Sequence, residues 1–335
     1  MTSTDPPLSR PAQLLDTVAD RSVIAGYSRI GYRVRRRHWP ADDPAPAALK
    51  GRTALVTGAN SGLGQATAAG LARLGATVVM MVRDPTRGTQ AREDVLRQVP
   101  DADLVVARCD VADLDDVARA ACESLARWPV VDVLVHNAGV LPTGRSETPQ
   151  GHELTLATHV LGPLAFTDQM RPALAASQDA RVIWVSSGGM YTQPLPAGDL
   201  EYRRGRYRGA VAYARTKRLQ VALTGLLDQR YAPDHIGVHC THPGWADTPG
   251  VAGSLPGFRT LTAPLLRTPA EGADTTIWLA ATQPAPPSGR FWHDRRPRPT
   301  HYLPGHRDDP EALHRAWRFC RAAAGLDPDR QDGDQ

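Results

Sequence analysis

The chain has 335 residues, of which 41% are hydrophobic and 22% are charged, so it can bury a sizeable core and is not globally disordered. Its formal net charge of +4 is too small for a dedicated nucleic-acid-binding protein, which concentrates a basic excess on one face. No apolar run approaches the ~18 residues of a membrane-spanning helix, and the polar, proline-rich start lacks the apolar stretch of a signal peptide. The four cysteines are widely spaced without a CxxC pair, so we expect no metal site and no disulfide framework, and we predict a cytoplasmic protein with reduced thiols.

Residues 1–50 are predicted to be an N-terminal extension that ends in a proline-rich linker. Apolar residues recur at roughly helical spacing from Leu14 to Val34, and a basic cluster runs from Arg33 to Trp39. This pattern leaves open a peripheral contact with an anionic membrane surface or a partner. The apolar face is narrow and imperfect, which favours an arm packed on its own domain with its arginines in solvent.

Residues 51–295 repeat a pattern of strand, helix and strand. The expected strands are Thr53–Thr57, Thr77–Val82, Leu104–Cys109, Val131–His136, Arg181–Ser186 and Gly237–Thr241. Intervening segments long enough for helices include Gly64–Leu74, Thr86–Gln98 and Leu114–Trp128. The alternation predicts an α/β protein with a single Rossmann-type, doubly wound parallel sheet of about seven strands and helices on both faces. We expect one domain over 51–295, followed by a C-terminal tail over 296–335 that is partly disordered.

The first expected strand leads into a glycine-rich turn, Thr57–Gly64, and then into a helix. Glycines permit a tight turn and a close approach of the backbone to a ligand, and a helix N-terminus presents N–H groups to a phosphate. An ordinary βα turn is the alternative. The position between a buried strand and a helix favours a dinucleotide site.

Arg83 follows the second strand, about 20 residues after the glycine turn, where a ribose-contacting residue is expected. An acidic residue there would favour NAD, whereas an arginine offers a planar cation to the 2′-phosphate of NADP. Arg87 is placed to assist, and Asp84 could oppose by turning inward. We therefore expect NADP(H), with NAD as the less favoured cofactor.

Tyr213 and Lys217 are four residues apart, so on a helix they share a face. A phenol is a poor acid or base at neutral pH, and we expect the lysine ammonium to lower its pKa into a working range. Lys217 is one of only two lysines in an arginine-rich chain, which favours a specific role. Ser187 ends a central strand and is placed to polarise a substrate carbonyl.

These residues together resemble the short-chain dehydrogenase/reductase family from Gly51 to about Asp294. The resemblance implies cofactor-binding positions in the turn (Gly58, Asn60, Ser61, Gly62, Leu63, Gly64), after the third strand (Asp110, Val111), in the Asn137-Ala138-Gly139 motif and in the nicotinamide-side motif (Pro243, Gly244, Thr248). It implies catalytic roles for Ser187, Tyr213 and Lys217, the latter two also touching the cofactor. Longer matches, including Val185–Met190 and His242–Val251, resemble the subgroup of family member twelve.

One position departs from the family pattern. His159 stands where the family usually has an asparagine whose backbone carbonyl holds a water that links the catalytic lysine to solvent. A histidine keeps that carbonyl, so the proton relay either survives or is impaired by the larger side chain.

The resulting expectation is an NADP(H)-dependent oxidoreductase that interconverts an alcohol and a carbonyl group on a small molecule. Two alternatives stay open: a cofactor-binding protein with little turnover that acts through interactions, and an epimerase or dehydratase, whose glycine turn is usually spaced differently. Apolar residues in segment 251–267 predict a lid over an apolar pocket. Homo-oligomerisation is left open.

Overall fold

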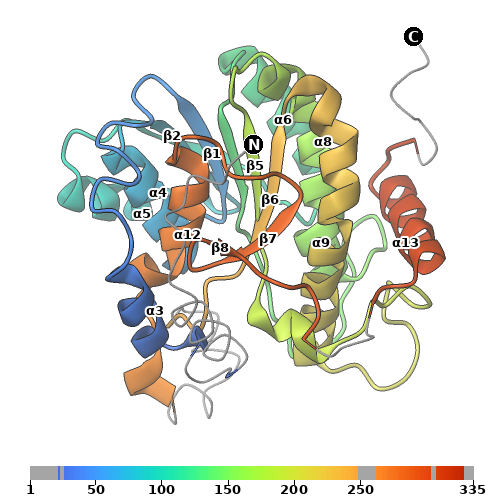
Figure 1. Cartoon of the computed structure of the whole chain (residues 1–335). Coiled ribbons are helices and arrows are strands. Elements are labelled where there is room, and N and C mark those ends of the chain that lie inside the picture. The colour runs from blue at the N-terminus through green and yellow to red at the C-terminus, as the bar shows by residue number, and fades with distance from the viewer. Residues whose placement is uncertain (1–21, 23–25, 248–261, 303–306, 328–335) are drawn as a thin grey trace.

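A single eight-stranded sheet runs through the centre of the molecule in a computed structural model that describes residues 22, 26–247, 262–302 and 307–327 (Figure 1). The strand order is β3-β2-β1-β4-β5-β6-β7-β8. The strands are β1 (Thr53–Thr57), β2 (Thr77–Val82), β3 (Leu104–Arg108), β4 (Val133–His136), β5 (Arg181–Val185), β6 (Gly237–Thr241), β7 (Arg290–His293) and β8 (Arg296–Pro297).

The described part thus has one strand more than the predicted number of about seven. β1 to β7 pair in parallel, and the short β8 pairs antiparallel with β7. Asp294 and Arg295 both adopt positive φ angles, +50° and +58°, and reverse the chain within two residues. This tight turn returns Pro297 beside Trp292 and creates the additional strand.

Helices cover both faces of the sheet, as the sequence predicted. α4, α5 and α12 lie on one face, and α6, α8 and α9 lie on the other (Figure 1). Their bounds are α4 (Gly62–Arg73), α5 (Pro85–Gln98), α6 (Leu114–Arg127), α8 (Gly162–Ala175), α9 (Gly209–Tyr231) and α12 (Pro269–Ala281). Shorter elements are α7 (Leu154–Leu156), the π-helical turn η1 (Ala157–Leu161), and the 3-10 turns η2 (Gly188–Thr192), η3 (Ala232–Asp234) and η4 (Ala263–Leu265).

Each face of the sheet has its own hydrophobic core. Along β1, Leu55 packs with the helices of one face, while Ala54 and Val56 pack with those of the other. All three side chains are fully buried. Burial on both faces explains why the strands read as continuous apolar runs rather than alternating ones.

The strand order reverses between β1 and β4. After β1 the chain builds outward through β2 and β3, and then returns to place β4 on the opposite side of β1. In open α/β sheets such a reversal leaves a crevice beyond the carboxyl ends of the strands. The fold therefore places the glycine turn after β1 and the Asn137 motif after β4 at one edge.

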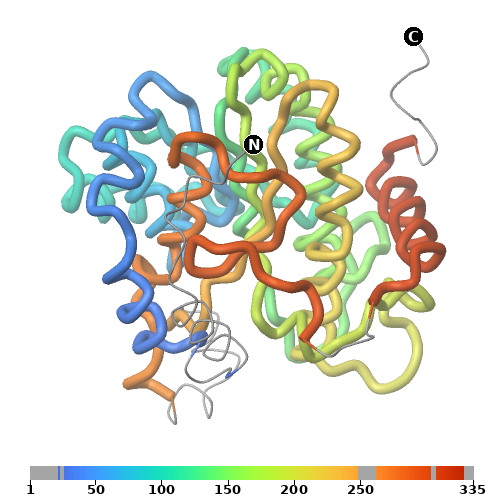
Figure 2. Tube along the Cα trace, in the orientation of Figure 1, coloured from blue at the N-terminus to red at the C-terminus, as the bar shows by residue number. Residues whose placement is uncertain are grey.

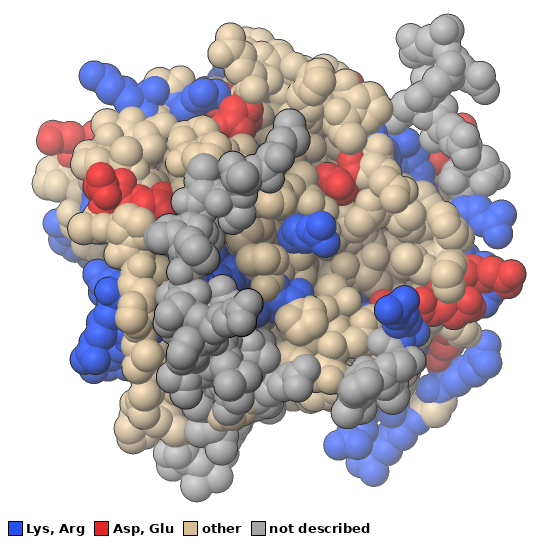
Figure 3. All heavy atoms as spheres, viewed as in Figure 1, with Lys and Arg blue, Asp and Glu red and all other residues tan. Residues whose placement is uncertain are grey.

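The described part of the N-terminal extension packs on the domain, which agrees with the favoured interpretation. Its helix α3 (Arg29–Arg36) lies near α12 (Figures 1 and 2), and Tyr32 is only 3% exposed. The Arg33 side chain is 60% exposed and lies 3.8 Å from the Glu271 carboxylate, and basic side chains gather over this edge of the molecule (Figure 3). Arg35 corrects the expectation of solvated arginines, because it is buried against Asp294.

The C-terminal segment contributes a helix that its composition did not indicate. α13 (Pro310–Ala323) begins at Asp309, whose carboxylate caps the first turn, and has proline at its first position. Ala316 and Cys320 are fully buried in the core that α8 and α9 share. No described helix is long and apolar enough to cross a membrane.

Candidate active site

A cavity of about 560 Å³ opens at the carboxyl ends of the strands. It brings together residues from the ends of β1 to β6 that lie as far apart in sequence as Gly58 and Ala246. The predicted site residues that line it are Gly58, Asn60, Ser61, Gly62, Leu63, Gly64, Arg83, Asp110, Val111, Asn137, Ala138, Gly139, Ser187, Tyr213, Lys217, Pro243 and Gly244. His159 lies beneath the lining, and Thr248 falls outside the described residues, as does most of the predicted lid over 251–267.

The glycine turn holds the backbone close around the start of α4. A Cβ atom on Gly64 would lie 2.2 Å from the Gly58 carbonyl oxygen and 2.4 Å from the Asn137 side-chain nitrogen, so no side chain fits there. Ser61 precedes α4 without a side-chain capping bond. The N–H groups of the first turn are thus left for a ligand, and this N-terminus fits a phosphate group.

Asn137 ties the ends of β1 and β4 together. Its side-chain Nδ2 donates to the Thr57 carbonyl at 3.0 Å, and its backbone N–H donates to Thr57 Oγ1 at 3.0 Å. The neighbouring Ala138 N–H donates to the same hydroxyl at 3.1 Å. These bonds fix the floor of the cavity at the point where the strand order reverses.

Arg83, Arg87 and Asp84 line the cavity beyond the end of β2. The Asp84 carboxylate caps α5, because its Oδ1 accepts from the backbone N–H groups of Thr86 at 2.9 Å and Arg87 at 3.3 Å. One carboxylate oxygen is therefore committed to the helix end. The two arginines bring positive charge to this end of the cavity.

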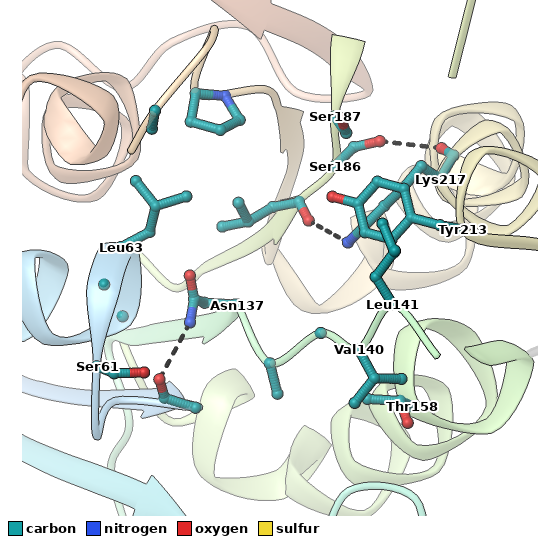
Figure 4. A pocket seen from close by; sticks show the side chains of 18 of the residues that line it. Ser61, Leu63, Asn137, Val140, Leu141, Thr158, Ser186, Ser187, Tyr213 and Lys217 are labelled. Carbon is teal, nitrogen blue, oxygen red and sulfur yellow. Dashed lines mark hydrogen bonds between the residues drawn. The ribbon is translucent and has the colours of Figure 1, made fainter. Parts of the chain in front are cut away.

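Ser187, Tyr213 and Lys217 meet at the opposite end of the cavity (Figure 4). Ser187 Oγ accepts from the Gly189 N–H at 3.1 Å, and its side chain lies at the same end of the cavity as the Tyr213 hydroxyl. Lys217 Nζ donates to the Val185 carbonyl at 2.7 Å and lies 5.5 Å from the centre of the Tyr213 ring. The spacing of four residues in α9 places both side chains on one face, as predicted.

Burial shifts both ionisable groups toward their neutral forms. It raises the pKa of Tyr213 above its ordinary value of 10.0, and the nearby Ser187 hydroxyl acts in the opposite direction. Burial also lowers the pKa of Lys217 to about 7. The sequence led us to expect a Tyr213 pKa lowered by the lysine charge, and this is corrected: exclusion of water raises the pKa instead.

His159 lies against the end of the cavity that holds Ser187, Tyr213 and Lys217, which we call the catalytic end because it holds the expected catalytic residues. It lies in η1, and such π-helical turns are frequent at functional sites. Its Nε2 accepts from the Val140 N–H at 3.0 Å, so Nδ1 carries the proton and donates to Thr216 Oγ1 at 2.8 Å. Burial lowers its pKa well below 6.5, so the ring is neutral. The ring also meets Tyr213 edge-on, with centroids 5.3 Å apart.

The His159 carbonyl, which the family pattern assigns to a water relay, accepts from Gln220 Nε2 at 2.7 Å. Gln220 is 1% exposed, and its Oε1 has no hydrogen-bond partner among the described residues. The sequence analysis missed Gln220. Its position three residues after Lys217 on the same helix is the signal that would have found it.

Several apolar residues of the catalytic end were also missed. They adjoin the motifs that were recognised, which is the signal that would have identified them: Val140, Leu141, Ala210, Trp245 and Ala246. Together they make this part of the lining largely apolar.

Comparison with known proteins identifies related sequences over most of the chain. The family described as short chain dehydrogenase matches residues 52–256. The bovine protein "Dehydrogenase/reductase SDR family member 12" is 38% identical over 279 residues, covering 82% of this chain and 86% of the relative. Human "Retinol dehydrogenase 14" is 31% identical, covering 94% of this chain and 98% of the relative.

A solved structure from Beutenbergia cavernae shares the fold with a TM-score of 0.57 and 26% identity. The match covers 71% of this chain and 92% of the chain in that structure. The structure is provisionally named an NAD(P)-dependent gluconate 5-dehydrogenase with bound NADP.

The geometry of the glycine turn predicts the effect of Gly64→Ala. The added Cβ would push the Gly58 carbonyl and the Asn137 amide apart, so we expect a loss of stability of about 1–3 kcal/mol and at least about tenfold weaker NADPH binding. Gly225→Ala is the matched control, because Gly225 lies in α9 with open space around it and should gain about 0.5–1 kcal/mol. Thermal unfolding and NADPH fluorescence titration measure both effects. Normal NADPH affinity in Gly64→Ala would contradict the assignment of this turn.

Proposed function

The chain belongs to the short-chain dehydrogenase/reductase family, and from this premise we propose that it is an NADP(H)-dependent oxidoreductase that interconverts an alcohol and a carbonyl group on an apolar small molecule. The observation that carries the proposal is the meeting of Ser187, Tyr213 and Lys217 with the glycine turn in one cavity. A fold alone would not distinguish functions, but this combination of groups supports hydride and proton transfer at one site.

The cavity suits a dinucleotide along its length. The uncapped N-terminus of α4 would hold the phosphates, and Asn137 and Pro243 would lie beside the nicotinamide half. When bound, the cofactor supplies or accepts the hydride. Arg83 and Arg87 would hold the 2′-phosphate that distinguishes NADP from NAD, while Asp84 is engaged with its own helix. The bound NADP in the structural relative supports this choice.

Tyr213 would exchange a proton with the substrate oxygen, as the acid in reduction and the base in oxidation. Its raised pKa keeps the phenol protonated at neutral pH, which suits the acid role. Ser187 would orient the carbonyl oxygen next to the phenol. Lys217, with a pKa near 7, would hold the nicotinamide ribose and carry part of its charge in the neutral range.

The substrate we propose is apolar near its reacting group. Val140, Leu141 and Trp245 line the catalytic end, so a polar substrate would lose hydration there without replacement hydrogen bonds. The name of the retinol dehydrogenase relative is consistent with a substrate of this class. A screen of apolar aldehydes and ketones that follows NADPH fluorescence tests this proposal.

A second candidate is cofactor binding without turnover. It is favoured by one observation, the bond from Gln220 to the His159 carbonyl, which occupies a position that the family uses for proton exchange. Binding of NADPH with no oxidation of it across the whole panel would support this candidate over the first.

The first prediction from this function concerns Tyr213→Phe, which removes the proposed proton donor and keeps the ring. We expect turnover to fall by about 10²–10⁴-fold while NADPH affinity stays within a factor of about two. Tyr202→Phe is the matched control, because the Tyr202 hydroxyl donates to the Arg206 carbonyl on the surface. Steady-state rates and fluorescence titration give the result, and near-normal turnover of the Tyr213 variant would overturn the mechanism.

The pH dependence follows from the raised pKa of Tyr213. Reduction consumes one proton, so the ratio of reduction to oxidation must fall about tenfold per pH unit. A phenol whose pKa exceeds 10 stays protonated, so reduction should be level between about pH 7 and 9 while oxidation rises. Initial rates in both directions, each as kcat/KM, measure this. A reduction rate that falls about tenfold per unit in that range would contradict the level profile expected from the phenol, and would show that a group required for reduction, Tyr213 or Lys217, loses its proton there.

Cofactor preference provides the third prediction. A charge-assisted hydrogen bond from Arg83 to a 2′-phosphate contributes roughly 1.5–3 kcal/mol, or about one to two decades of affinity. We expect the natural chain to prefer NADPH over NADH by at least about tenfold, and Arg83→Ala to lose most of that preference. Arg73→Ala, at the end of α4 and outside the cavity lining, controls for the change in net charge. Titration of each chain with NADPH and NADH measures the ratio of the two affinities. An unchanged ratio in Arg83→Ala would show that Arg83 does not bind the 2′-phosphate.

A further inference from the structure

Residues 26–36, which we call the arm, lie against two loops that wall the catalytic end of the cavity. The Tyr27 ring packs on Gly188, so closely that a Cβ on Gly188 would lie 2.5 Å from it. The Tyr27 carbonyl accepts from the Trp245 N–H at 2.8 Å. Gly188 follows Ser187, and Trp245 follows the Pro243-Gly244 motif. One residue of the arm thus touches both loops.

The contact with the second loop is equally tight. A Cβ on Gly244 would lie 2.7 Å from the Tyr27 carbonyl oxygen, and Gly244 itself has a φ of +71°. Both observations require glycine at this position. The loop beside the proposed nicotinamide site is therefore shaped around the arm.

A buried ionic cluster holds the arm in place. The Asp294 carboxylate accepts from Arg267 at 2.6 and 2.9 Å and from Arg35 of the arm at 2.7 Å. Arg267 and Asp294 are each 1% exposed. Because charged hydrogen bonds between groups excluded from water are strong and directional, this cluster fixes the position of the arm against β7.

Arg267 links the arm directly to the cavity wall. Its guanidinium donates to the carbonyls of Gly26 at 3.1 Å and Tyr27 at 3.1 Å in the arm, and to the Pro243 carbonyl at 3.3 Å in the loop. Asp294, whose carboxylate accepts hydrogen bonds from this guanidinium, has a left-handed backbone conformation with a φ of +50°. This conformation is uncommon for residues other than glycine. Such a conformation persists only where the surroundings over-determine it.

We infer that the arm is a positioning element of the active site: Tyr27, held by the Arg35–Asp294–Arg267 cluster, sets the separation between the Ser187–Gly188 loop and the Pro243–Trp245 loop. The inference rests on the proposed function. Tyr27 is not among the residues that line the cavity, so it acts through the two loops. A displacement of about 1 Å between reacting groups can cost about 10²-fold in rate.

The arm contacts the part of the cavity proposed for the nicotinamide half of the cofactor, and not the part proposed for the adenosine half. The arm contacts the loops after β5 and β6, whereas the adenosine half would lie on the glycine turn and beyond β2. Disturbing Tyr27 should therefore weaken binding of the nicotinamide half and leave binding of the adenosine half unchanged. A general loss of stability would not produce this difference.

The test compares NADPH with adenosine 2′,5′-diphosphate, which lacks the nicotinamide half. In Tyr27→Ala of the full chain, we expect at least about tenfold weaker NADPH binding and at least about tenfold lower kcat with an apolar aldehyde such as retinal. The affinity for the fragment should stay within about twofold. Tyr27→Phe keeps the ring and loses the hydroxyl contact with Tyr302, so it should restore both NADPH binding and kcat.

Tyr231→Ala is the matched control, since Tyr231 is an equally buried tyrosine at the C-terminal end of α9 and is not among the residues that line the cavity. This variant should have a lower melting temperature, but the ratio of its affinities for NADPH and adenosine 2′,5′-diphosphate should equal that of the natural chain. If Tyr27→Ala fails to fold, Tyr27→Leu keeps an apolar side chain and is judged by the same ratio.

The outcomes for the arm and for the proposed function are distinguishable. NADPH binding and kcat of Tyr27→Ala, or of Tyr27→Leu if Tyr27→Ala does not fold, within about twofold of the natural chain would overturn the role of the arm alone. The binding comparison requires no turnover, so it decides the question even if no substrate is reduced. Failure of the natural chain to bind either NADPH or the fragment would overturn the proposed function, and the role of the arm with it.

Discussion

The contact between the ends of β1 and β4 is the constraint on which the whole site depends. The two strands are neighbours although β2 and β3 separate them in sequence, and the Asn137 amide bonds the Thr57 carbonyl across the gap. Gly64 lets α4 begin directly against this junction. The N-terminus of α4 and the floor of the cavity are thus placed relative to each other by hydrogen bonds between buried strand ends. Loops attached to a scaffold that is packed on both faces can then carry the chemistry.

Exclusion of water is the second constraint on the site, because it disfavours the charged forms of the ionisable side chains at the catalytic end. Tyr213, Lys217 and His159 are all shifted by burial toward their neutral forms. A hydrogen bond from a neutral phenol to a carbonyl oxygen is stronger in such surroundings than in water. The arrangement therefore favours the protonated donor, and the lysine is the group of this set whose charge changes near pH 7.

Local patterns were sufficient to predict the sheet, its two helical layers and most of the cavity lining. A glycine turn between a strand and a helix, or a Tyr–Lys pair four residues apart, carries its geometry within a few residues. The direction of the Tyr213 pKa shift could not be read in this way, because it depends on how much water the folded chain excludes. Tyr27 was missed for a related reason: its partners are distant in sequence. Arg267 and Tyr27 are 240 residues apart, and no periodicity links them.

Two segments outside the repeating βα pattern, one N-terminal and one C-terminal, contact the elements that form the catalytic end. The N-terminal arm contacts the loops after β5 and β6. The C-terminal segment contacts α9, where Arg218 donates to the Thr300 carbonyl at 2.6 Å and pairs with Asp308. Arg218 directly follows Lys217, so the helix that carries the proposed catalytic pair, Tyr213 and Lys217, is held by contacts with the C-terminal segment. The two segments also meet each other, because the Tyr27 and Tyr302 hydroxyls are 2.8 Å apart. A cut at residues 50 and 295 would leave the glycine turn and Asn137 intact but would remove these contacts. The common fold therefore supplies the dinucleotide half of the cavity, and the terminal segments of this chain secure the half where the substrate would react.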